Sequence, residues 1–153
     1  MRPLLFAPAA LLLAAAAFAQ SAPPVPTTKC GADSAAFSVQ LPQTVLANGQ
    51  PLAAGSYQVR ITAERPAPAV GQSPAGECWN EFVQDHAVVG KEMASVVPAA
   101  DIDAVAKGPA PRPSAARVDL LKGGEYLRVW LNDAGTHYLV NMPVERVVRD
   151  ERR

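Results

Sequence analysis

The chain has 153 residues, and its 14 basic and 14 acidic side chains give a formal net charge of zero. Proteins that bind nucleic acid or anionic membranes through electrostatics usually carry a clear basic excess, so this balance argues against both functions. Fifteen prolines and ten glycines favour turns and irregular connections over long helices. The length suits one domain with an apolar core of its own.

The first nineteen residues have the three parts of a secretory signal peptide. Arg2 provides a positive start, residues 4–18 form an apolar run, and Ala17-Phe18-Ala19 has the small-x-small form of a cleavage site. The run is shorter than the roughly 20 residues that span a bilayer, and a polar, proline-rich segment follows it. We therefore expect cleavage after Ala19 and a periplasmic or secreted protein without stable membrane insertion.

Two cysteines, Cys30 and Cys78, lie far apart in the sequence. In an oxidising compartment, one disulfide between them is the simplest prediction. Lipid attachment to Cys30 is the alternative, but it requires a cysteine directly at the cleavage site, and Cys30 follows Thr27-Thr28-Lys29. His86 and His137 lack the spacing of metal ligands and are expected at the surface. The sequence predicts neither a metal nor a cofactor.

The composition divides the chain into four parts. We expect a signal peptide at 1–19, an extended segment at 20–34, a single β domain at 35–145 and a charged tail at 146–153. Prolines and glycines mark two loops inside the domain. These loops are residues 64–77 and 98–115, and the second is expected to contain a helical turn within 100–106.

Alternation of apolar and polar residues predicts strands in the first half of the domain, at 37–41 and 57–61. Asn48-Gly49 indicates a tight turn between them. Two further strands are expected at 78–84 and 88–97.

Two hairpins are predicted in the C-terminal third. Gly123-Gly124 lies between two apolar runs, and this turn places Asp119 opposite Arg128 and Arg117 opposite Trp130. The register assigns one face to the core, with Val118, Leu120, Leu127, Val129 and Leu131. It assigns the other face to Arg117, Asp119, Tyr126, Arg128 and Trp130.

The second hairpin, through residues 132–135, is compatible with two registers. A two-residue loop leaves His137 and Asn141 in water, whereas a three-residue loop with a bulge at Gly135 reverses the two faces. We favour the first register because it keeps polar side chains in solvent. It places three apolar side chains in the core, namely Tyr138, Val140 and Met142.

Seven to eight short strands without a sustained helical period predict an all-β fold. An antiparallel Greek-key sandwich is favoured, with a small β-barrel as the alternative. Residues 52–57 have the L-x-x-G-x-Y form of a tyrosine corner, in which Tyr57 hydrogen-bonds back to the preceding chain. Residues 48–60 resemble the nG-x-x-LPAG-x-Y-x-V segment of small exported bacterial proteins of unknown function, with Ala53 replacing the usual Pro. The resemblance implies an immunoglobulin-like or prealbumin-like sandwich and no reaction.

Catalytic motifs are weak in this sequence. Residues 71–75, Gly-Gln-Ser-Pro-Ala, lack the final glycine of a nucleophile elbow and carry Pro directly after Ser73. The carboxylate pairs Asp101/Asp103 and Asp150/Glu151 fall in a loop and in the tail, where solvated charge is the ordinary state. We predict that the protein is not an enzyme, with a hydrolase as the remote alternative.

The candidate binding surface is the outward stripe of the first C-terminal hairpin. Aromatic and guanidinium groups are enriched at interfaces, so an envelope protein, a peptide or a glycan is the expected partner. The competing interpretation buries Trp130 beneath the 98–115 loop, because large aromatic side chains are usually covered. The alternative function is then a structural or assembly component without a ligand. The stripe consists of Arg117, Tyr126, Arg128 and Trp130.

Overall fold

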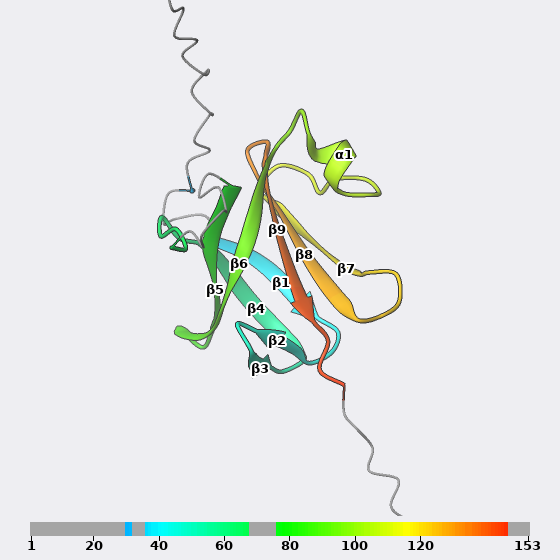
Figure 1. Ribbon diagram of the computed structural model, residues 1–153. Helices are drawn as coiled ribbons and strands as arrows, with labels where there is room; N and C mark the ends of the chain where they lie inside the picture. The colour runs from blue at the N-terminus through cyan, green and yellow to red at the C-terminus, as the bar shows by residue number, and fades with distance from the viewer. Residues whose placement is uncertain (1–29, 32–35, 68–75, 147–153) are drawn as a thin grey trace, which may run out of the picture.

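The computed structural model describes residues 30–31, 36–67 and 76–146 (Figure 1). The predicted signal peptide, most of the N-terminal segment, residues 68–75 of the first loop and nearly all of the tail lie outside these residues. Within them the chain forms nine strands and one short helix, α1 (Ile102–Val105), which confirms the all-β fold class. No described helix is long and apolar enough to cross a membrane.

Seven strands form one antiparallel sheet in the order β1-β4-β5-β6-β9-β8-β7. Its edge strands β1 and β7 contact each other, so the sheet curls until it is nearly closed. A separate two-stranded sheet, β2-β3, lies at the opposite end from α1 (Figure 1). The strands are β1 (Ala36–Leu41), β2 (Val45–Ala47), β3 (Gln50–Leu52), β4 (Gly55–Ile61), β5 (Glu77–Gln84), β6 (Ala87–Pro98), β7 (Ala115–Leu120), β8 (Tyr126–Asp133) and β9 (Thr136–Pro143).

Strands β6 to β9 have Greek-key connectivity. Hairpins join β7 to β8 and β8 to β9. On its other side β9 pairs with β6, so β9 lies between β6 and β8. The chain between β6 and β7 must therefore cross from the middle of the sheet to its edge. The predicted 98–115 loop is this crossover, and it carries α1.

The core lies inside the curl of the sheet. Strands β1 and β4 alternate buried and exposed residues, as their sequences predict, because successive side chains point to opposite faces. The Tyr57 hydroxyl donates a hydrogen bond of 2.8 Å to the carbonyl oxygen of Ala53, the contact expected for the L-x-x-G-x-Y segment. Cys30 and Cys78 form the predicted disulfide, which ties the N-terminal segment to β5.

Tight turns set the registers of the hairpins. Asn48-Gly49 and Ala134-Gly135 both have positive φ angles, as type I′ turns require. The second turn confirms the two-residue loop, since Asp133 pairs with Thr136. The predicted β7–β8 register is also confirmed, with Arg117 opposite Trp130 and Asp119 opposite Arg128.

Two side chains of these hairpins lie elsewhere than predicted. Leu120 was assigned to the core but is 56% exposed, because it is the last residue of the edge strand β7. His137 was expected in water but is only 3% exposed. It lies on the outer face of β9. The crossover packs against this face, and residues from both form a second, small apolar cluster. That cluster consists of Val97, Ile102, Ala106, Trp130 and Leu139.

Candidate functional site

Helix α1 and the crossover cover the outer face of the sheet at Trp130, which confirms the competing interpretation that the 98–115 loop buries this residue. Trp130 is 1% exposed and packs with Ile102 and Ala106 of the crossover. Asn132 fastens the same segment, because its Nδ2 donates a 2.7 Å hydrogen bond to the carbonyl oxygen of Pro111. Trp130, the central aromatic residue of the predicted binding surface, is therefore not accessible to a ligand.

Trp130 also has a polar partner beneath this cover. Its Nε1 donates a 3.0 Å hydrogen bond to Nδ1 of His137, and the two ring centroids lie 5.8 Å apart in an edge-on arrangement. A histidine that accepts at Nδ1 is neutral and carries its proton on Nε2. Desolvation lowers the pKa of His137, which favours this neutral form, while the nearby carboxylate of Asp103 opposes the shift.

Two other residues of the predicted surface, Arg117 and Arg128, lie partly exposed on β7 and β8. Arg117 donates from Nε to Oδ1 of Asp119 and from Nη1 to the carbonyl oxygen of Pro109, both at 2.7 Å. Arg128 donates from Nε to Oδ1 of Asn141 at 3.1 Å. Asp119 thus forms its ion pair with Arg117 of its own strand, although Arg128 is its cross-strand neighbour.

A cleft of about 360 Å³ brings these arginines together with two lysines. Lys107 comes from the crossover after α1, and Lys122 comes from the turn between β7 and β8. We call this site the basic cleft because four cations and a single carboxylate line it. Its lining residues are Val105, Lys107, Arg117, Asp119, Leu120, Leu121, Lys122 and Arg128.

A glycine allows the crossover to approach the cleft. Gly108 has a φ of +93°, a backbone conformation that other residues adopt with strain. A Cβ atom at this position would lie 3.2 Å from Nη1 of Arg117. Gly108 therefore lets the chain that carries Lys107 pass close to the guanidinium group. The remaining surface residue, Tyr126, is 47% exposed but does not line the cleft.

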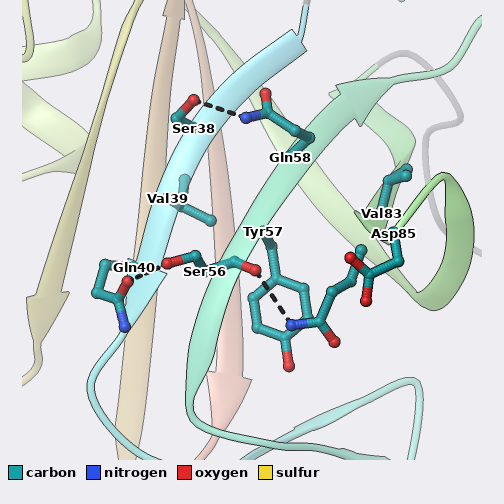
Figure 2. Close-up of a pocket in the computed structure, with 9 residues that line it drawn as sticks. Ser38, Val39, Gln40, Ser56, Tyr57, Gln58, Val83 and Asp85 are labelled. Carbon is teal, nitrogen blue, oxygen red and sulfur yellow. Dashed lines mark hydrogen bonds between the residues drawn. The ribbon is translucent and has the colours of Figure 1, made fainter.

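A second hollow, of about 570 Å³, lies on the polar face of β1, β4 and β5 (Figure 2). Its polar side chains bond mainly to one another. Gln58 Nε2 donates to Ser38 Oγ at 2.7 Å, and Ser56 Oγ donates to Gln40 Oε1. Asp85 is the only charged residue in its lining. The only sequence feature related to this hollow is the alternation of apolar and polar residues, which places polar side chains on this face of the strands.

The structure describes only some of the candidate catalytic and metal-binding residues. Ser73, Asp150 and Glu151 lie outside the described residues, and His86 is exposed on the turn between β5 and β6. In the part of the chain that the structure describes, no three His, Cys, Asp or Glu side chains come together as metal ligands do.

No family model, curated protein or solved structure matches this chain.

Proposed function

We propose that this protein is an exported, non-catalytic binding module of the cell envelope, and that its ligand binds in the basic cleft. The observation that carries the proposal is the charge of the cleft, whose lining has three more positive than negative side chains. The whole chain has no net charge, so this excess is a local feature. The leader-like N-terminus and the disulfide support export to an oxidising compartment.

The two lysines distinguish the cleft from an ordinary solvated face. Lys107 and Lys122 are exposed, and neither has an ion-pair partner among the described residues. An anionic ligand gains attraction from both without breaking an existing pair. The polar hollow of Figure 2 is a weaker candidate, because a ligand there must replace the hydrogen bonds that join its side chains.

The burial of Trp130 favours the second candidate function, a structural or assembly component without a ligand. That function needs no open aromatic surface, and the crossover covers the residue almost completely. The two candidates differ in one respect. A binding module requires accessible cations in the cleft, whereas a purely structural protein tolerates reversal of the Lys122 charge.

Retention of envelope material by the purified, oxidised protein tests the proposal. Labelled envelope proteins and glycans are passed over immobilised wild type, Lys122→Glu and Arg112→Glu. Arg112 is an exposed cation of the crossover outside the cleft lining, so its variant has the same change in net charge. We expect one fraction to be retained by wild type and Arg112→Glu and lost by Lys122→Glu. Equal behaviour of all three proteins would contradict the proposal.

Export is tested separately by sequencing the N-terminus of the protein recovered from the periplasm or the medium. A chain that starts at Gln20 is expected, because Ala17-Phe18-Ala19 is the predicted cleavage site. Recovery only from the cytoplasm, with Met1 retained, would contradict this part of the proposal.

A further inference from the structure

We infer that the basic cleft binds an acidic peptide segment of another envelope protein, in which Asp or Glu carboxylates stand beside an apolar side chain. This inference rests on the proposed function and adds the chemical class of the ligand. Three properties of the cleft support it, namely its preset guanidinium groups, the carboxylate within it and its apolar rim.

The two guanidinium groups are held in place yet keep donors for a ligand. Arg117 uses Nε and Nη1 in its bonds to Asp119 and Pro109, and Arg128 uses Nε in its bond to Asn141. A guanidinium group has five N–H donors, so each arginine retains some. Groups that are already oriented lose less side-chain entropy on binding, and their planar fork matches a carboxylate.

Asp119 lowers the positive charge of the cleft and shows how a carboxylate fits its guanidinium groups. Its side chain is only 22% exposed and lies in the cleft lining, where its negative charge repels an incoming anion. The 2.7 Å bond between Arg117 and Asp119 also shows a carboxylate already bound to a guanidinium group of this cleft.

The rim of the cleft explains why a peptide fits better than a small anion, a bilayer or a sugar. Val105 and Leu120 are 52% and 56% exposed beside the cations, and they offer contacts that a free anion cannot use. The concave shape suits a single chain more than a flat bilayer. The lining contains no aromatic ring on which a sugar could stack.

Fluorescence anisotropy with synthetic probes tests this ligand class. The probe is a capped, labelled Leu-Glu-Glu-Leu-Glu peptide, and its neutral twin has Gln in place of each Glu. We expect the acidic peptide to bind wild type more tightly than the twin, with an affinity that falls as salt is added. Affinity should drop about tenfold in Arg128→Gln and in Lys122→Glu, while Arg112→Glu should retain it. Lys122→Glu changes an exposed turn residue, so it leaves the core intact.

Other outcomes separate the ligand class from the binding site. Equal affinity for both peptides, or binding that ignores Lys122→Glu and Arg128→Gln, overturns the acidic-peptide inference. If inorganic phosphate or phosphatidylglycerol vesicles bind in a Lys122-dependent way and the acidic peptide does not, the inference fails while the cleft remains a binding site. If Lys122→Glu also retains every envelope fraction that wild type retains, the proposed function itself fails.

Discussion

The Nε1 group of Trp130 donates a hydrogen bond to Nδ1 of His137, and the crossover buries both side chains against the outer face of β8 and β9. The bond satisfies an indole donor that would otherwise be buried without a partner. It also requires a neutral imidazole, because protonation at Nδ1 would replace the acceptor with a second donor. Protonation of His137 would therefore break a hydrogen bond beneath the crossover, so the packing of α1 against the sheet is expected to depend on pH.

Acidification is predicted to weaken the fold through His137. Burial lowers the pKa of His137 in the folded protein, so the unfolded chain, near the ordinary value of 6.5, binds its proton first. The stability from this residue is fully present above about pH 6.5 and declines as the pH falls toward the folded pKa. Urea unfolding at pH 7.5 and 5.0 should show a larger loss for wild type than for His137→Gln. Identical losses would refute the prediction.

The two tryptophans are expected to differ in their access to a quencher. Trp130 is 1% exposed, whereas Trp79 on β5 is half-buried with the Lys91 ammonium group 5.1 Å from its ring centroid. In Trp79→Phe, the emission of Trp130 should be blue-shifted and resistant to acrylamide. In Trp130→Phe, the emission of Trp79 should be quenched more strongly. Strong quenching of Trp130 would show that the crossover does not cover it in solution.

Local sequence signals predicted much of the sheet. The β7–β8 register followed from the Gly123-Gly124 turn and from placing Asp119 opposite Arg128, and the structure has this register. The Asn48-Gly49 turn was predicted because Asn and Gly readily adopt the positive φ angles that a tight hairpin turn requires, and both residues have them. Such signals act between residues that are close in sequence, so the sequence of one hairpin is enough to predict its turn and its register.

The cover over Trp130 was predicted only as the competing interpretation, because large aromatic side chains are usually buried, and the complete cleft was not predicted. Alternation shows that Trp130 and His137 point away from the core, but not that a segment from between β6 and β7 packs over them. The cleft combines the predicted Arg117 and Arg128 with Lys107 and Lys122 from two connections. Only the path of the crossover brings Lys107 to β7, and no local pattern encodes that path.

Removal of the disulfide should destabilise the protein substantially. Cys30 and Cys78 are 48 residues apart, and a crosslink over such a loop is worth about 3 to 4 kcal/mol in the chain-entropy model. We expect a loss of this size in the free energy of unfolding for the double variant Cys30→Ser/Cys78→Ser. Reduction of wild type with dithiothreitol is the matched measurement. If reduced wild type unfolds at the same denaturant concentration as the oxidised protein, the prediction is wrong.

Asn80 is predicted to lower the free energy of unfolding, because its polar side chain lies in the core. Its side chain on β5 is fully buried, and neither Oδ1 nor Nδ2 has a hydrogen-bond partner in the described structure. Unsatisfied buried polar groups each cost roughly 1–3 kcal/mol, whereas a leucine side chain of similar size would not need a partner. Asn80→Leu should therefore raise the free energy of unfolding by about 1 kcal/mol or more, since repacking offsets part of the gain.

Chemical denaturation of the Asn80→Leu variant measures this gain, and Gln84→Leu serves as the control at an exposed position near the end of the same strand. The control should change the free energy of unfolding by less than about 0.5 kcal/mol, as surface substitutions usually do. A destabilised Asn80→Leu variant would mean that the amide has a partner in solution, such as a buried water molecule, and that leucine removes it.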